Sequence, residues 1–354
     1  MYVAWRDLRA ARGRFGLIGT VVVLVTVLVG LVSGLTAGLA RESTSAIADL
    51  PADRIVLAAP EPGEKASLTT SELDTATVDA WRAVPGVADV TPVTVATTRA
   101  TGERRASVTV MGAPEGSAVA PGVAPSRIVL SESAAEDLGV TAGGTLTLGG
   151  AELTVAAVEG DASLSHVPVV WTVPADVPAQ GRADSVAATF LAVTLADDGL
   201  DTAAVDAGLG TSTTTVQGAL RTIGAFTSEN ASLQMMQAFL LVISALVVGS
   251  FFTVWTVQRA GDVAVLRALG ASTRLLLRDA LGQVLVLLLA GTGVGMLLVV
   301  GLGAVIGNVV PFVLSPSTIL VPFVALVVLG LAGAGLAVRR VTSVDPLTAL
   351  GSAR

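Results

Sequence analysis

His166 is the only histidine in this chain of 354 residues, and it is the first residue to test for chemistry. A Ser-His-Asp arrangement would also need a nucleophile motif, and the sequence contains none. A single histidine beside a strand is most simply a structural or surface residue, and the nearby Glu159 and Asp161 are most simply a solvated turn. A phosphate-cradling loop would need Gly-x-x-x-x-Gly-Lys-Ser/Thr, but the only lysine, Lys65, follows Gly63-Glu64. We therefore expect no catalytic residue, and any ATP hydrolysis must come from a separate chain.

Glu229 is a second candidate, because it is the last ionisable residue before a long apolar run. In a helix, Ser232, Leu233 and Met236 fall on its face at i+3, i+4 and i+7, and Met235 is adjacent. A glutamate at the end of a membrane helix is commonly an interfacial boundary, and methionine is a common packing residue. These residues alone leave a binding site and a plain boundary both open.

The composition indicates which elements must position these residues. The chain is 52% hydrophobic and only 14% charged, which is typical of a membrane protein rather than of a soluble domain. Four uncharged stretches are long enough, at about 1.5 Å per residue, to cross a hydrocarbon core of about 30 Å. They are residues 17–39, 231–257, 280–310 and 318–338. The connection 311–317 leaves room only for a turn, so the last two helices form a hairpin.

The first apolar stretch could also be a secretory signal peptide, since basic residues precede it and Gly38-Leu39-Ala40 resembles a cleavage site. Its apolar run is longer than the roughly 7–15 residues of a signal core. Gly30, Gly34 and Gly38 recur every four residues, as on helix-packing faces in membranes. We therefore expect a permanent transmembrane helix.

Charge predicts the orientation, because short cytoplasmic segments retain Lys and Arg. Residues 1–14, the loop between the second and third helices, and the tail after residue 338 together carry 11 basic and 4 acidic residues. The segment from Arg41 to Asn230 carries the remaining 10 basic and 24 acidic residues. We expect a multi-pass protein of the cell membrane with both termini in the cytoplasm. The acidic balance argues against nucleic acid as a partner.

Residues 41–228 are predicted to form an extracytoplasmic α+β domain between the first and second helices. The strand-like runs are residues 53–58, 107–111, 145–148 and 153–158. One helix is expected to begin at Thr70 or Ser71 and to end at Pro85-Gly86, and another is expected at Ser131 to Leu138, before Gly139. The chain has no cysteine, so this domain must be held by its own core.

Two segments are predicted on the cytoplasmic face. Residues 1–16 have apolar side chains at helical spacing among arginines, which favours an amphipathic elbow helix on the inner leaflet. The loop 258–279 contains a short helix that ends at Gly270. Its apolar Val263, Leu266 and Leu269 could insert into a groove on a soluble partner or pack on the bundle itself.

The order of one helix, a large domain and three helices resembles the MacB/FtsX-like permeases of ATP-binding cassette (ABC) systems. The segment Arg259 to Ser272, with its Leu-Arg-Ala-Leu-Gly-Ala-Ser ending, resembles that family's coupling helix. The tail from Arg340 to Leu350 and the segment from Ile128 to Leu148 also resemble family segments. The resemblance implies a homodimer bound to two copies of an ABC ATP-binding subunit, which holds ATP and Mg. In that family ATP-driven closure moves the helices and outer domain as a lever. The residues it implies for ATPase coupling are Asp262, Val263, Val265, Leu266, Arg267 and Leu269.

The start of the second helix, from Phe226 to Ala245, resembles haem-exporting permeases of Gram-positive bacteria, the HrtB type. There a glutamate at the outer end of this helix lies in the dimer's haem site, which implies that Glu229 contacts haem here. The resemblance implies haem as the transported substrate, with no cofactor of the chain's own. Because haem is flat, amphipathic and membrane-soluble, a side entrance from the lipid would suit it. The remaining candidates for the haem site are Ser232, Leu233, Met235 and Met236. Carboxylate and thioether groups can both approach a haem iron, so the iron-ligand candidates are Glu229, then Met235, Met236 and the more distant His166.

The family's aromatic haem contacts have no counterpart, since the only tyrosine, Tyr2, lies on the cytoplasmic side. Two other functions therefore stay open. The chain could export an antimicrobial peptide, an antibiotic or a lipid. It could instead be an FtsX-like protein that regulates a cell-wall hydrolase without transport.

Overall fold

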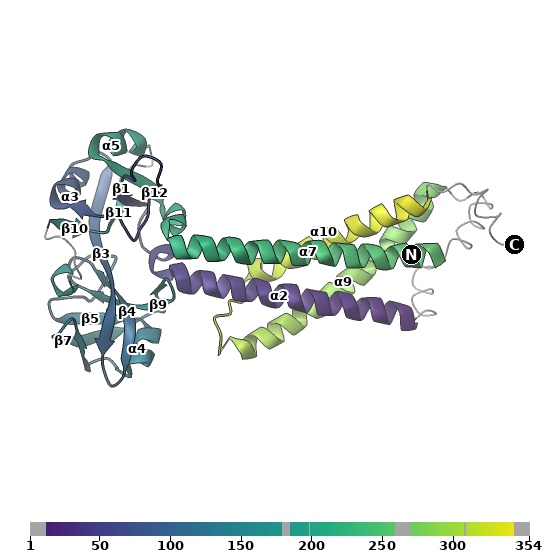
Figure 1. The fold of residues 1–354 in the computed structure, drawn as a ribbon, viewed down its shortest axis with the longest axis horizontal. Coiled ribbons are helices and arrows are strands. Elements are labelled where there is room, and N and C mark those ends of the chain that lie inside the picture. The colour runs from purple at the N-terminus through teal and green to yellow at the C-terminus, as the bar shows by residue number, and fades with distance from the viewer. Residues whose placement is uncertain are drawn as a thin grey trace. The chain divides into compact units, whose positions relative to one another are not determined.

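A computed structural model describes residues 12–178, 185–197, 199–258, 270, 272–307 and 309–342. The chain folds as two compact units. One, which we call the helical unit, consists of residues 1–38 and 232–354, and the other, the inserted domain, of residues 39–231. Figure 1 shows their elements, and each unit is described by itself.

The long helices are α2 (Arg12–Ala48), α7 (Gly224–Gln258), α9 (Thr273–Ile306) and α10 (Pro316–Thr342). In the described part of the chain, four segments are long and apolar enough to span a membrane: Gly16–Ala48, Gly224–Val254, Arg278–Ile306 and Pro316–Leu336. This confirms the predicted fold class of four membrane helices with an α+β domain between the first and second. Helices α2 and α7 are longer than their apolar runs, because residues such as Arg41, Glu42 and Glu229 end the apolar run without ending the helix.

The inserted domain is built on one large mixed sheet. Its strands are β1 (Arg54–Ala58), β3 (Val87–Thr101), β4 (Arg105–Gly112), β5 (Arg127–Leu130), β6 (Thr145–Leu148), β7 (Ala151–Val158), β8 (Ser163–Leu164), β9 (Val167–Thr172), β11 (Phe190–Leu195) and β12 (Thr211–Thr215). The order is β12-β1-β11-β3-β4-β9-β5-β7-β6, and β8 pairs with β9. Because β6 also pairs with β3, six strands close into a ring. The long β3 runs through both halves of the sheet (Figure 1).

The remaining elements of this domain are short. They are β2 (Leu73–Asp74), which pairs with β10 (Val186–Ala188), and the helices α3 (Thr75–Arg82), α4 (Glu132–Leu138), α5 (Thr202–Leu209) and α6 (Val216–Ala219), with 3-10 turns at Pro174–Asp176 and Leu220–Thr222. Helix α4 follows its sequence signals, since Ser131 caps its N-terminus and Gly139 ends it in a left-handed conformation. The prediction for α3 was wrong at its start. Asp74 caps it through the backbone N–H of Thr77, while Ser71 accepts a hydrogen bond from the N–H of Ala58.

Three apolar clusters fill the domain. One lies within the strand ring and another surrounds the buried Trp81 of α3. The third includes Ala46, Ile47 and Leu50 at the end of α2, together with Ile223 and the partly buried Phe226 at the start of α7. Because burial of such side chains contributes about 1.5–3 kcal/mol each, the ends of both helices are firmly part of the domain.

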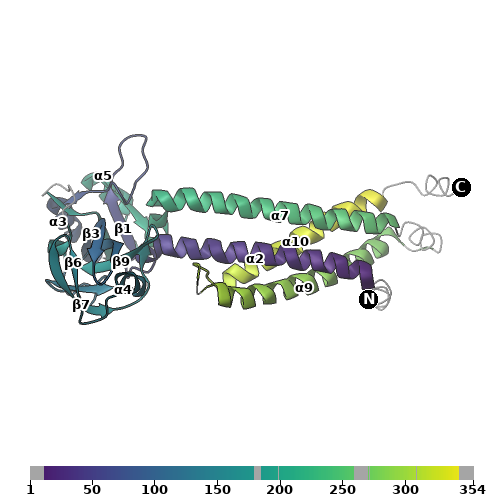
Figure 2. The same ribbon diagram turned by 60° about the horizontal axis from the view of Figure 1, so that its bottom comes forward.

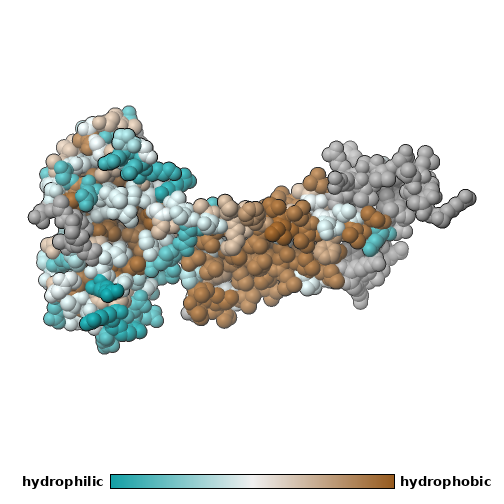
Figure 3. Space-filling model, in the orientation of Figure 1, coloured by the Kyte–Doolittle hydropathy of each residue, from teal (hydrophilic) through white to brown (hydrophobic). Residues whose placement is uncertain are grey.

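The helical unit presents an apolar surface, shown in brown in Figure 3. Its helices run alongside one another in both ribbon views (Figure 2). The glycines predicted to pack do so. A side chain on Gly30 would meet Val299 of α9, and one on Gly34 would meet the ring of Phe312. A Cβ on Gly38 would overlap the carbonyl of Pro311, in the connection between α9 and α10, while the N–H of Val313 donates to the carbonyl oxygen of Gly34 at 3.1 Å.

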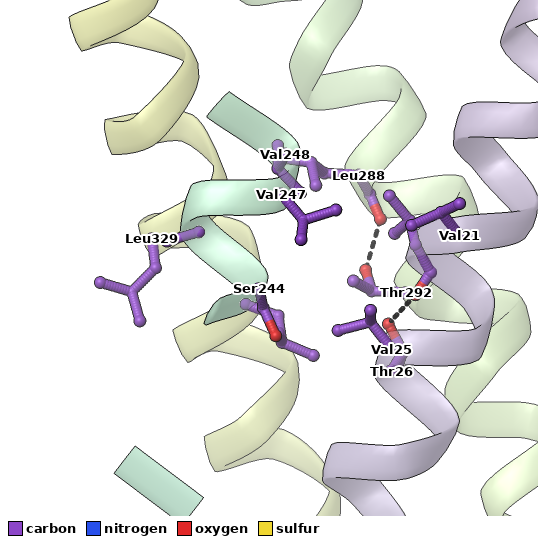
Figure 4. A pocket seen from close by; sticks show the side chains of 12 residues that line it. Val21, Val25, Thr26, Ser244, Val247, Val248, Leu288, Thr292 and Leu329 are labelled. Carbon is purple, nitrogen blue, oxygen red and sulfur yellow. Dashed lines mark hydrogen bonds between the residues drawn. The ribbon is translucent and has the colours of Figure 1, made fainter. Parts of the chain in front are cut away.

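A small pocket between the helices contains Thr26, Ser244 and Thr292 among apolar side chains (Figure 4). Each hydroxyl donates to a carbonyl oxygen four residues earlier in its own helix, namely those of Val22, Leu240 and Leu288. The hydroxyls are therefore already satisfied within their helices, as an apolar environment requires, and the pocket serves packing.

The packing of the glycine face gives a first testable prediction. Replacing Gly38 with Ala should destabilise the protein, by about 1–3 kcal/mol for an overpacked site, because the new methyl group overlaps a backbone carbonyl. Gly19→Ala is the matched control on α2, since nothing lies within 4 Å of a Cβ there. It should be neutral or gain up to about 1 kcal/mol of helix propensity. Thermal unfolding of the full chain in lipid nanodiscs measures both, and equal midpoints for the two variants would contradict the packing described here.

Candidate functional site

The site is built around a two-residue turn in the inserted domain. Leu164 of β8 pairs with Val167 of β9, so the loop between them is Ser165-His166. Both loop residues have positive φ, 51° and 62°. This is the geometry of a type I′ hairpin turn, which normally favours Asn-Gly. Residues other than Gly in this region cost about 1–3 kcal/mol each, so surrounding contacts must hold the turn.

Helix α2 supplies those contacts. The N–H of Ser165 donates to the carbonyl oxygen of Ser43 at 3.0 Å, and the N–H of His166 to that of Glu42 at 3.3 Å. The N–H of Ser163 donates to Oγ of Ser45 at 2.9 Å. Ser43 and Ser45 are buried, at 0% and 2% exposure. The hairpin is therefore fixed directly on the last turns of α2.

The imidazole of His166 lies between two carboxylates. Its Nδ1 is 3.3 Å from Oε2 of Glu42, and its Nε2 is 2.8 Å from Oε2 of Glu229 near the start of α7. Oγ of Ser43 also lies 3.2 Å from Nε2. The side chains of Glu42, His166 and Glu229 are 45%, 34% and 36% exposed, so solvent reaches all three. We call Glu42, Ser43, His166 and Glu229 the His166 cluster.

This arrangement favours the protonated imidazole. Partial burial acts to lower the pKa of His166, but the hydrogen bonds and charges of Glu229 and Glu42 outweigh it and raise the pKa above its ordinary value of 6.5. A neutral ring has a proton on only one nitrogen, so its other nitrogen would face a carboxylate that cannot donate a hydrogen bond to it. In the described part of the chain, these two glutamates are the charged groups that face the ring.

The His166 cluster is arranged for hydrogen bonding rather than for holding a metal ion by itself. The two glutamates approach different ring nitrogens, on opposite sides of the imidazole. Among the described residues, no group of three or more acidic or histidine side chains could hold a metal ion. What the cluster offers to a ligand is the second oxygen of Glu229.

Helix α7 carries the other predicted binding residues. Met235 and Met236 are 62% and 45% exposed, Ser232 is exposed, and Leu233 is partly buried. They belong to the helical unit, whereas Glu229 belongs to the inserted domain. Their role in binding stays a prediction.

Sequence reasoning named His166 and Glu229 but missed Glu42 and Ser43. His166 is separated in sequence from Glu229 by 63 positions, from Ser43 by 123 and from Glu42 by 124. No local sequence pattern signals contacts between residues so far apart. Glu159 is exposed, and Asp161 accepts a hydrogen bond from Oγ of Ser133. The predicted coupling residues Asp262, Val263, Val265, Leu266, Arg267 and Leu269, most of the elbow 1–16 and most of the tail 339–354 lie outside the described residues.

Comparison with known proteins defines the class. The chain matches the profile of the MacB-like periplasmic core domain over residues 17–223 and that of the FtsX-like permease C-terminal region over residues 214–346. The first match alone spans more than half of the chain. These two regions together define a membrane permease of the ABC type. The chain belongs to the MacB/FtsX family of ABC transporter permeases and is a multi-pass membrane protein.

Individual relatives match over shorter stretches. A protein of Staphylococcus haemolyticus named as the permease protein HrtB of a hemin transport system is 33% identical over 129 residues, which cover 36% of this chain and 37% of that protein. An uncharacterized ABC transporter permease of Mycobacterium tuberculosis is 32% identical over 130 residues, covering 34% of each chain. The crystal structure of the periplasmic region of MacB from Actinobacillus actinomycetemcomitans is 16% identical, with a TM-score of 0.37, and covers 48% of this chain and 90% of that one. The two sequence relatives are thus matched over little more than a third of their length.

The raised pKa of His166 predicts a pH-dependent contribution to stability. Because the pKa is higher in the folded protein than the ordinary 6.5, this contribution is complete below about pH 6.5 and is lost as the pH rises through the folded pKa. We expect wild type to exceed His166→Gln in apparent melting temperature by the widest margin at low pH. The comparison uses the full chain in nanodiscs from pH 5 to pH 9. Since all other titrating groups are shared, a margin that widens with rising pH would refute the assigned pairing.

Proposed function

We propose that this chain is the permease subunit of an ABC efflux pump that exports haem from the membrane. The observation that carries the proposal is the solvent-accessible carboxylate of Glu229 near the start of α7. It is supported by the local similarity to a protein named for hemin transport. The chain would act as a homodimer with two copies of an ATP-binding subunit, which binds ATP and Mg and drives export by a lever-like movement.

The chemistry of α7 suits a flat, amphipathic, membrane-soluble substrate. Glu229 offers an anionic oxygen ligand, and Met236, seven residues later on the same helix, offers a thioether. Met235 and Met236 are exposed, so they are accessible to a substrate arriving from lipid. A two-fold dimer would bring two such sets of residues into one assembly.

The proposed orientation places both termini in the cytoplasm and the inserted domain outside. It rests on the excess of arginine in the segments that flank the helices and on the acidic excess between Arg41 and Asn230. Glu229 would then lie at the outer end of α7, where an exported substrate leaves.

Titration of the purified full chain with haem, followed by the Soret band, tests the proposal. Wild type should shift the band saturably. Glu229→Ala should weaken binding by about 10–100-fold, as expected for loss of an interaction with a charged group. Glu64→Ala is the matched control, because Glu64 is an exposed loop glutamate of the same domain. It should bind as wild type does.

A cellular assay completes the test. Cells that express the chain with its ATPase should survive toxic haem, and cells with Glu229→Ala should not. Absence of any Soret shift in wild type, together with ATPase stimulation by a peptide or lipid but not by haem, would replace haem with that substrate class.

A further inference from the structure

The β8–β9 hairpin makes Glu229 part of a chain of contacts that begins in the buried end of α2. Ser43 is fully buried, and its carbonyl oxygen holds the N–H of Ser165. The carbonyl of Glu42 holds the N–H of His166, and its side chain faces Nδ1 of the ring. The carbonyl groups of Ser43 and Glu42 thus fix the backbone of the turn, and the carboxylate of Glu42 contacts its imidazole.

The ring then reaches α7 with its other nitrogen. Nε2 of His166 is 2.8 Å from Oε2 of Glu229, the shortest contact of the cluster. The second oxygen of Glu229, Oε1, accepts no hydrogen bond from the part of the chain that the structure describes. One oxygen is therefore held by the protein, and the other belongs to a side chain that solvent reaches.

The backbone conformation of this turn is unfavourable for the residues that occupy it. Two consecutive left-handed residues other than Gly, Ser165 and His166, cost about 1–3 kcal/mol each. A hairpin that served only to connect β8 to β9 would be more stable with Asn-Gly. The left-handed backbone of His166 is what lets its N–H face α2 while its ring bridges Glu42 and Glu229.

We infer that His166, held by Glu42 and Ser43, is a positioning residue that orients the carboxylate of Glu229 toward the substrate. It holds Oε2 and leaves Oε1 free to contact the iron or a polar edge of the substrate. The inference rests on the proposed function, because it assigns His166 a role in the use of Glu229. Hydrogen bonds that orient a metal-binding carboxylate typically contribute about 10–100-fold to affinity.

Two substitutions separate this role from simple stability. The amide nitrogen of Gln stands where Nε2 of histidine stands, so His166→Gln keeps a donor for Glu229. The amide of Asn replaces Nδ1 instead, so His166→Asn keeps the contact with Glu42 and loses the one with Glu229. Asn also tolerates the left-handed backbone better than most residues. Loss of function in His166→Asn therefore cannot be attributed to a weakened turn.

The experiment is a Soret titration of the full chain with haem, using wild type, His166→Gln, His166→Asn and Glu229→Ala, with melting temperature measured in parallel. We expect His166→Asn to bind about 10–100-fold more weakly, with a shifted Soret maximum, and to lose no more melting temperature than His166→Gln at the same pH. We expect His166→Gln to remain within about threefold of wild type.

Each outcome decides the matter. If wild type and His166→Asn share affinity and Soret maximum while Glu229→Ala loses binding, the positioning role is overturned and the proposed function stands. If Gln and Asn weaken binding equally, the ring itself is needed, as for a direct iron ligand, and positioning through Nε2 is overturned. If wild type binds no haem, both the proposed function and the inference fall.

Discussion

A membrane offers no hydrogen-bond partners, and this constraint decides where the chain can carry chemistry. Thr26, Ser244 and Thr292 return their hydroxyl groups to carbonyls of their own helices. Small residues let neighbouring segments pack closely, which is a common basis of helix packing in lipid. Gly30, Gly34 and Gly38 pack in this way against Val299, Phe312 and Pro311. The polar side chains of the His166 cluster lie beyond the apolar runs, in the parts of α2 and α7 that belong to the inserted domain.

The same constraint explains which parts of the fold could be predicted from the sequence. An uncharged run of sufficient length has few alternatives to a spanning helix, so the four helices and the inserted domain follow from composition. Helix α4 was predictable because Ser131 and Gly139 act locally. Helix α3 was less so, since Ser71 and Asp74 are both capping residues and the tertiary contact of Ser71 with Ala58 decides between them. The closure of β3 on β6 joins residues far apart in sequence and has no local signal.

The candidate site, like the fold, could be predicted from the sequence only in part. Glu229 stands out because it ends an apolar run, and His166 stands out because it is the only histidine. Nothing in the sequence indicates that they touch, or that Glu42 completes the cluster. The turn that joins them also lacks its usual signature, because Ser165-His166 occupies a geometry in which Asn-Gly is expected. Sequence patterns report the preferences of local backbone, whereas here tertiary hydrogen bonds to α2 override those preferences.

The two helices that enter the inserted domain are attached to the β8–β9 hairpin in different ways. Helix α2 is bound through the backbone carbonyls of Glu42 and the buried Ser43, and Ala46 and Ile47 lie in the core. Helix α7 reaches the hairpin through Glu229, whose side chain is 36% exposed. A partly exposed side-chain contact is weaker than a set of buried backbone bonds, because solvent competes for it. Loss of the contact between Glu229 and His166 would therefore leave intact the apolar core that Ile223 and Phe226 share with the end of α2.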